Sequence, residues 1–333
     1  MAMDTGFGFT KAVREDGRRV CFPSAVMARS GSGALSGVIG GGGAGYGVRL
    51  EQYGETRRVL VGEAALGLGA VRSWDTQAAA RTDYEVLTLS ALALLGVQGA
   101  CSLAVGLPLG LYAVTGDRTA LRDRLEGLEA KVTVEGREPV SVAVGRVTVL
   151  PQAAGAYYAA LLVDRSIGTR PCGVLDIGFR TSDALLMLPV GRSAQPDEMR
   201  SVSFDQGIGG TFEAVARAVS EETGTMIPAG AVERAANGDG RLAVRGREVD
   251  VAERLAVVQR ELAEGIAAQL RRLWGADLDL LGALVVAGGG GRALLSHLRG
   301  LTPAVRLASE PLYANAEGFL ALLGSRSAQT AAR

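Results

Sequence analysis

The sequence predicts an α/β fold of two similar lobes, and three observations lead to this prediction. The chain has 333 residues, of which 48% are hydrophobic, enough for two domains with separate cores. Segments with strand character alternate with segments of helical periodicity along the chain. The segment MDTGFGFTKAV, which contains Asp4, is echoed by LDIGFRTSDAL, which contains Asp176. Each half of the chain therefore begins with an aspartate and a glycine turn between two strands.

In the first half the predicted strands are 7–13, 18–24, 46–54, 56–62, one beginning at 101, and strands within 130–150. The predicted helices are 81–99, 117–127 and 151–164, the last with Pro151 at its first position. The glycine-rich stretch 30–47 predicts a flexible loop, with a subunit-contact loop as the alternative.

The second half repeats this order. Two strands around a tight glycine turn are expected over 171–188, and a strand, a glycine turn and a helix over 201–224. Helical periodicity extends from about Asp250 to Trp274. A buried strand, a four-glycine loop and a helix are predicted over 281–300, and a short helix over 310–324.

The composition argues against several classes of protein. Thirty-five basic and 35 acidic residues give zero formal net charge, which favours neither nucleic acid nor a membrane surface as a direct partner. We expect no signal peptide and no transmembrane helix. Cys21, Cys101 and Cys172 lie far apart in apolar runs, which predicts buried free thiols in the cytoplasm. The single histidine, His297, lacks partners for a zinc site or a catalytic triad and is expected on a helix surface.

The glycine turns have the chemistry of a phosphate site. Backbone N–H groups in such a turn can approach phosphate oxygens because no Cβ intervenes, and an aspartate at the strand end can hold Mg²⁺ through water. A dinucleotide-binding loop is excluded because Gly6 and Gly8 are followed by strand residues rather than by a third glycine and a helix. The Walker A pattern is absent.

Four segments together, DTGFGFTK, PQAAGAYYA, DIGFRTSD and VVAGGGGRAL, resemble the nucleotide-binding signature of the actin-like ATPase superfamily. With VGLPLGLY and PLYANAEGF, they look most like bacterial and archaeal actin-like proteins of the ParM, plasmid-segregation type. The resemblance implies an actin-like fold, in which each lobe has a mixed sheet flanked by helices, a duplicated ribonuclease-H-like core, and the nucleotide lies in the cleft between the lobes. Lobe I would comprise residues 1–163 and 310–330, and lobe II residues 164–309.

In the first phosphate motif the resemblance implies that Asp4 holds a magnesium-bound water. The nucleotide-binding residues of this motif would be Gly6, Phe7, Gly8, Phe9, Thr10 and Lys11. Only two of the 35 basic residues are lysines, Lys11 and Lys131, so a compact ammonium at position 11 supports a role in neutralising phosphate.

In the second phosphate motif Asp176 would be the other carboxylate on the magnesium side. The residues expected at the phosphates are Gly178, Phe179, Arg180 and Thr181. Many relatives have a second glycine where this chain has Phe179, so this turn departs from the family pattern. Arg180 is a candidate to supply charge in place of the amide contacts.

The polar residue that positions the attacking water falls on Gln152. Glutamine orients a water but cannot take its proton, so slow hydrolysis is expected. The adenosine motif falls on Gly288, Gly289 and Gly290. Additional phosphate or ribose contacts are expected from Gly207, Gly209, Gly210 and Glu213.

The function that the resemblance implies is a cytoplasmic ATPase that binds ATP or ADP, with GTP possible, together with Mg²⁺, and that polymerises into filaments. Plasmid or DNA segregation through a DNA-binding adaptor protein would be its role, without direct contact to nucleic acid or membrane. The alternatives are a sugar or acetate kinase of the same fold, and a non-hydrolysing actin-like scaffold or pilus-assembly adaptor.

Overall fold

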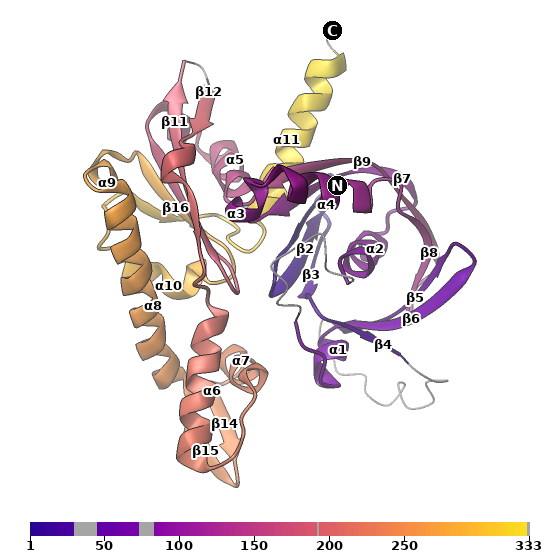
Figure 1. Cartoon of the computed structure of the whole chain (residues 1–333), viewed down its shortest axis with the longest axis horizontal. Helices are drawn as coiled ribbons and strands as arrows, with labels where there is room; N and C mark the ends of the chain where they lie inside the picture. Colours follow the sequence, from indigo (N-terminus) through magenta and orange to yellow (C-terminus); the bar gives the residue numbers. More distant parts are fainter. Residues whose placement is uncertain (30–44, 73–82, 192, 332–333) are drawn as a thin grey trace. The chain divides into compact units, whose positions relative to one another are not determined.

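The computed structural model describes residues 1–29, 45–72, 83–191 and 193–331 (Figure 1). The chain forms two compact units, of which unit 1 comprises Met1–Val163 with Leu312–Arg333, and unit 2 comprises Asp164–Pro311. Most of the predicted glycine-rich loop, residues 30–44, lies outside the described residues. Its last residues, Gly45–Gly47, begin a strand instead.

Unit 1 is built on a mixed sheet of nine strands in the order β3-β2-β1-β7-β9-β8-β5-β6-β4. The strands are β1 Ala2–Thr5, β2 Phe9–Val13, β3 Arg19–Pro23, β4 Val26–Ala28, β5 Gly45–Gln52, β6 Glu55–Gly62, β7 Gly99–Leu107, β8 Glu129–Val134 and β9 Val140–Pro151. The helices are α1 Glu63–Gly67, α2 Tyr84–Leu94, α3 Leu109–Tyr112, α4 Thr115–Leu125, α5 Ala154–Val163 and α11 Ala314–Ala331.

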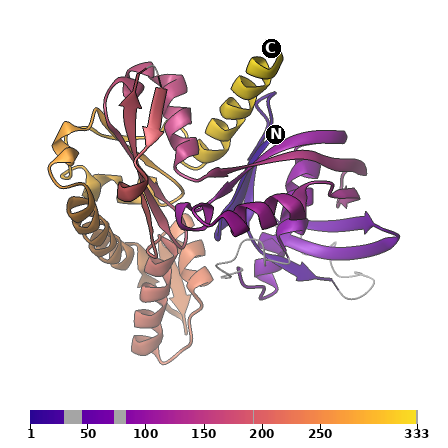
Figure 2. The ribbon, with the colours of Figure 1, turned by 45° about the horizontal axis from the view of Figure 1, so that its top comes forward.

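The central strands of this sheet are covered on both faces. Successive side chains of a strand point to opposite faces, so Met3 and Val105 share one core with α2, while Ala2 and Ala104 share another with Phe319 of α11. Both faces of β1 and of the second half of β7 are therefore buried. Figure 2 shows α11 beside α5 on one side of the sheet.

Unit 2 has a six-stranded mixed sheet in the order β12-β11-β10-β16-β17, with β13 pairing to β11, and a separate hairpin of β14 and β15. The strands are β10 Cys172–Ile177, β11 Ser182–Val190, β12 Ser193–Pro196, β13 Val202–Phe204, β14 Arg241–Val244, β15 Arg247–Asp250, β16 Ala283–Ala287 and β17 Val305–Leu307. The α-helices are α6 Gly209–Thr223, α7 Ala229–Asn237, α8 Val251–Trp274, α9 Asp277–Leu280 and α10 Gly291–Leu298, and the 3₁₀ helices are Arg165–Thr169 and Glu198–Arg200.

The two sheets share one strand pattern. In unit 1, β3, β2 and β1 pair antiparallel, and β7 and β9 follow in parallel. In unit 2, β12, β11 and β10 pair antiparallel, and β16 and β17 follow in parallel. The predicted class, two mixed sheets flanked by helices, is confirmed, and the echo between the two halves reflects a repeated five-stranded core.

Three expectations from the sequence need correction. Pro151 ends β9 instead of beginning the helix, because its strand still pairs with Leu107, and α5 starts three residues later. The last helix, α11, is longer than the short helix predicted. All three thiols are free, but only Cys172 is fully buried, and burial raises its pKa to about 12. His297 is exposed on α10, as predicted.

None of the helices in the described part of the chain combines the length and the apolar character that crossing a membrane requires.

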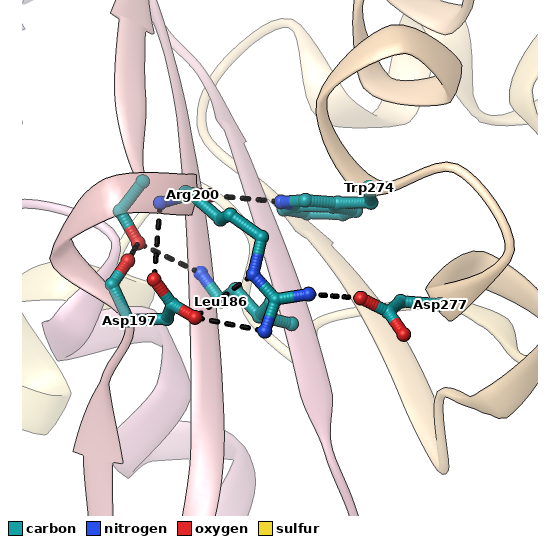
Figure 3. A network of polar contacts seen from close by, with 6 residues as sticks. Leu186, Asp197, Arg200, Trp274 and Asp277 are labelled. Atoms are coloured by element: carbon teal, nitrogen blue, oxygen red, sulfur yellow. Dashed lines mark hydrogen bonds and ion pairs between the residues drawn. The ribbon is translucent and has the colours of Figure 1, made fainter.

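A polar network holds the C-terminal end of α8 against the sheet of unit 2 (Figure 3). Asp197 accepts hydrogen bonds from the backbone N–H of Arg200 at 3.1 Å and from its Nε at 2.8 Å. The same guanidinium pairs with Asp277, and the indole of Trp274 donates to the carbonyl of Arg200 at 2.8 Å. Since Asp197 also donates its N–H to the carbonyl of Leu186, the network joins β11 to α8 and α9.

Removal of this network gives a pH-dependent loss of stability. The hydrogen bond from Arg200 lowers the pKa of Asp197. The free energy of unfolding therefore includes a contribution from this ion pair above the ordinary aspartate pKa of about 4, and this contribution is lost as the pH falls through the lowered pKa. We expect Arg200→Ala to reduce the free energy of unfolding by about 1 kcal/mol at pH 7, since the side chain is partly exposed. Urea unfolding followed at pH 7 and at about pH 3 should show this deficit shrinking in acid.

The matched control is Arg241→Ala, which removes the exposed pair with Glu248 in the β14–β15 hairpin and should shift the urea midpoint less. A deficit in Arg200→Ala that is equal at both pH values would contradict the role assigned to the ion pair with Asp197.

Candidate functional site

The first candidate element is the turn between β1 and β2 in unit 1. The strands pair so that Asp4 lies opposite Lys11 and Thr5 opposite Thr10. The N–H of Gly6 donates to the carbonyl of Phe9 at 3.0 Å and closes the turn. This amide therefore stabilises the turn itself, so phosphate contacts from this segment would fall to Phe7, Gly8 and Phe9.

Asp4, Lys11 and Gln152 meet beside this turn. Lys11 Nζ donates to Asp4 Oδ2 at 2.9 Å, as expected for directly opposed residues of an antiparallel pair. Gln152 Nε2 donates to Asp4 Oδ1 at 2.6 Å from the end of β9, two strands away. Asp4 is only 4% exposed and Gln152 only 7%. A buried carboxylate needs such partners, and here each of its oxygens has one.

Arg72 is a residue at this turn that reasoning from the sequence did not select. Its Nε donates to the carbonyl of Gly8 at 3.1 Å, and its guanidinium carbon lies 5.2 Å from the centroid of the Phe9 ring. The Gly8 carbonyl also accepts from the N–H of Ser24 at 3.0 Å. Arg72 therefore fixes the middle of the turn, and no motif could have identified it within an arginine-rich chain.

A small hollow lies between this turn and the end of β7. Thr5, Gly6 and Phe7 line one side of it, and Gly106, Leu107 and Pro108 contribute to the other. The Gly-Leu-Pro segment of the sequence is therefore adjacent to the first turn in space.

The turn between β10 and β11 in unit 2 has the same construction. The N–H of Gly178 donates to the carbonyl of Thr181 at 2.9 Å, as Gly6 does to Phe9. Asp176 lies opposite Asp183, where unit 1 has Asp4 opposite Lys11. The two turns thus agree in backbone geometry but differ in charge.

Arg180 stands in this second turn where the first turn has Gly8. Its Nε lies 3.3 Å from Asp205 Oδ1, so part of its charge is engaged within unit 2. Asp183, which occupies the place of Lys11, accepts a hydrogen bond from the hydroxyl of Ser203. The positive charge that unit 1 places beside its aspartate has no equivalent at position 183.

The four-glycine loop after β16 packs against Asp176. β10 and β16 are adjacent parallel strands, so their carboxyl ends meet at one edge of the sheet. A Cβ on Gly288, whose φ is +81°, would lie 2.4 Å from Asp176 Oδ1, and Gly290 donates its N–H to the carbonyl of Ile177 at 2.9 Å. Gly289 is the exposed glycine of the predicted adenosine motif.

Gly207 and Gly209, where α6 begins, serve mainly to hold the second turn. Gly209 donates its N–H to the carbonyl of Phe179 at 2.7 Å, and a Cβ on Gly207 would lie 2.5 Å from the same oxygen. The amide of Gly209 is thus already used inside unit 2. Gly210 and Glu213, in contrast, are exposed at the start of the helix.

The residues present fit a magnesium ion held through water and not a metal site made of protein alone. Within the residues that the structure describes, no group of three or more His, Cys, Asp or Glu side chains could hold a metal. Both oxygens of Asp4 already accept hydrogen bonds. Magnesium commonly keeps several waters and relies on one or two carboxylates plus substrate phosphates, which matches one strand-end carboxylate beside each glycine turn.

Comparisons with known families cover both parts of the chain. Residues 2–155 match the family described as actin like proteins, N-terminal domain. Residues 174–300 match the family described as archaeal actin homologue MreB-like, C-terminal.

Individual relatives match over nearly the full length. Archaeal actin homologues of Thermoplasma acidophilum and Thermoplasma volcanium are 25% and 26% identical, with 96% of this chain and 97% of each relative covered. Among solved structures, a non-polymerisable ParM mutant superposes with a TM-score of 0.82 at 23% identity, over 97% of this chain and 98% of that one. An archaeal actin homologue in complex with ADP gives 0.79 at 23% identity, with the same shares covered. These superpositions confirm the predicted actin-like fold.

The packing role of Gly207 can be tested by comparing substitutions at Gly207 and Gly210. Gly207→Ala places a methyl 2.5 Å from Phe179 backbone and should destabilise the protein by about 1–3 kcal/mol. Gly210→Ala meets nothing within 4 Å and lies in α6, so it should leave stability unchanged or raise it by up to about 1 kcal/mol. Urea unfolding without nucleotide measures both, and equal effects of the two substitutions would contradict the close approach.

Proposed function

Because the chain belongs to the actin-like proteins, we propose that it binds ATP and ADP together with Mg²⁺ and hydrolyses ATP. The observation that carries this proposal is the buried Asp4, which is bonded to both Lys11 and Gln152 beside a glycine turn. A turn of the same geometry beside Asp176 supports it, as does the ADP complex of a similar archaeal protein.

In this proposal the residues of unit 1 serve the phosphates and the attacking water. Lys11 neutralises phosphate charge, and Asp4 holds a water of the magnesium ion, which when bound screens the phosphate charges. Gln152 uses its Nε2 to bond Asp4, which leaves Oε1 to accept a hydrogen bond from the attacking water. Since glutamine cannot take the proton, the γ-phosphate or bulk water accepts it, and turnover is slow.

The residues of unit 2 contact the phosphates from a second turn and bind the adenosine group. Asp176 is the second carboxylate that holds magnesium-bound water, and Gly178, Phe179, Arg180 and Thr181 face the phosphates. The adenosine group binds at Gly288, Gly289 and Gly290. Gly210 and Glu213, exposed at the start of α6, are better placed for ribose contacts than the buried Gly209.

We further propose that the protein assembles into filaments that act in plasmid or DNA segregation. A solved filament of 15 strands formed by ParM from Clostridium botulinum has the same fold, with a TM-score of 0.83 at 21% identity. Because the formal net charge is zero, contact with DNA is assigned to a separate DNA-binding adaptor protein.

Nucleotide binding is tested by the two lysines of the chain. Lys11→Ala removes the ammonium beside Asp4 and should weaken ATP binding by about 10- to 100-fold, the size of effect of losing one hydrogen bond to a charged group. Lys131→Ala removes an exposed lysine 3.9 Å from Glu51 and should leave the affinity unchanged. Titration with fluorescent ATP and GTP analogues measures both variants, and equal affinity of Lys11→Ala and wild type would contradict the assignment.

Hydrolysis is tested by phosphate release from the wild type and from Asp176→Ala. We expect slow release from the wild type and none above background from Asp176→Ala. Nucleotide binding without any phosphate release would favour a non-hydrolysing scaffold, and a phosphorylated small-molecule product would favour a kinase.

Filament formation is tested by 90° light scattering and pelleting with ATP, with ADP and without nucleotide. We expect assembly with ATP and a fall in scattering as ATP is consumed. A protein that stays in the supernatant at high concentration, across nucleotides and salts, would overturn the filament proposal.

A further inference from the structure

We propose that Asn315, at the start of the C-terminal helix α11, is the positioning residue for Gln152. This inference rests on the proposed function, in which Gln152 orients the attacking water. Asn315 acts through the backbone that carries Gln152, and its effect on the phosphate turn passes through that residue.

Gln152 lies in a two-residue link between a strand and a helix. Its N–H donates to the carbonyl of Leu107 at 2.7 Å, which fixes the link to the end of β7. The next residue, Ala153, has φ +65°, a left-handed conformation that is strained for a non-glycine residue. Such a conformation persists only where surrounding contacts enforce it.

Asn315 supplies that contact. Its Oδ1 accepts hydrogen bonds from the N–H of Ala153 at 3.0 Å and from the N–H of Ala156 at 3.2 Å. These are N–H groups at the beginning of α5, where a helix has no internal acceptors. The capping oxygen thus comes from a residue far along the sequence instead of from the residue before the helix.

The crossing of α5 and α11 fixes the position of this cap. A Cβ on Gly318 would lie 1.8 Å from the carbonyl oxygen of Gly155, and a Cβ on Gly155 would lie 2.4 Å from that of Asn315. Asn315 itself is 5% exposed. The two helices therefore touch through their backbones, and this contact leaves Asn315 little freedom to move away from Ala153.

The consequence is a continuous set of contacts from α11 to the predicted water-orienting group. Asn315 holds Ala153 in its left-handed conformation, and Ala153 directs the chain so that Gln152 projects toward Asp4. The 2.6 Å bond from Gln152 Nε2 to Asp4 then sets which way the amide faces.

The first experiment measures ATP affinity and turnover in Asn315→Ala. We expect the Kd for ATP to stay within about 3-fold of the wild type, while kcat falls about 10-fold, equivalent to about 1.4 kcal/mol in the activation free energy. Asn315→Asp keeps an oxygen acceptor and adds a charge favoured at a helix N-terminus, so it should restore most of kcat. A kcat in Asn315→Ala equal to that of the wild type would overturn the inference.

The matched control is Asp250→Ala. Asp250 caps α8 in unit 2 by accepting from the N–H of Glu253 at 3.0 Å, so its removal should cost similar stability without changing kcat. An equal fall in kcat for both variants would mean that general loss of stability, and not the position of Gln152, is responsible.

A double variant separates action through Gln152 from other effects. If Asn315 acts only by positioning Gln152, then Gln152→Ala with Asn315→Ala should be no slower than Gln152→Ala alone. If the double variant instead loses kcat by the product of the two single-variant factors, the inference is overturned. If Asn315→Ala does not fold, Asn315→Ser, which is too short to bridge to α5 in the same way, replaces it in both experiments.

A last measurement does not depend on hydrolysis, so failure of the proposed function and failure of this inference remain distinguishable. The side-chain amide resonance of Gln152 is assigned by its loss in Gln152→Ala. In the nucleotide-free wild type and in Asn315→Asp, its protons should be protected from exchange and its chemical shift should differ from that of a solvated glutamine. In Asn315→Ala, the protection should fall and the chemical shift should move toward that of a solvated glutamine. An unchanged resonance in Asn315→Ala would overturn the inference even if the wild type releases no phosphate.

Discussion

The carboxylate of Asp4 is the group on which the arrangement of unit 1 depends. It is buried near the centre of a nine-stranded sheet, where an uncompensated charge would be costly. Its two partners come from the adjacent strand and from a residue 148 positions along the chain. The strand order that brings β9 near β1, the turn that sets Lys11 opposite Asp4, and the crossing of α5 with α11 all serve to satisfy this one group.

The turns in the two halves of the chain share a backbone geometry but carry different side chains. Both turns close through a glycine N–H and the carbonyl three residues later. The residue opposite the aspartate is Lys11 in one half and Asp183 in the other, and Gly8 in one corresponds to Arg180 in the other. A repeated core therefore supplies one turn with a partly buried cation opposite its aspartate and one turn with a second acid in that place, which suits the two turns to distinct tasks.

Much of the fold could be predicted from the sequence because its signals are local. Short runs with strand character marked β5 and β6, and the helical periodicity from about Asp250 to Trp274 marked α8. The predicted start of α5 was wrong because the preference for proline at the first helical position is local, whereas the pairing of Pro151 with Leu107 is a long-range contact. Asp4, Lys11 and Gln152 are bonded to one another, and their role at a nucleotide stays a prediction. Arg72 and Asn315 act through contacts that no local pattern records.

The return of the chain to unit 1 at Leu312 has a consequence for synthesis on the ribosome. Unit 2 is one continuous segment, so all of its residues are available before α11 is made. The face of the large sheet formed by Ala2, Val13 and Ala104 stays uncovered until Phe319 and its neighbours emerge. β1 thus waits for α11, and a nascent chain that stops before α11 exposes an apolar surface that chaperones recognise.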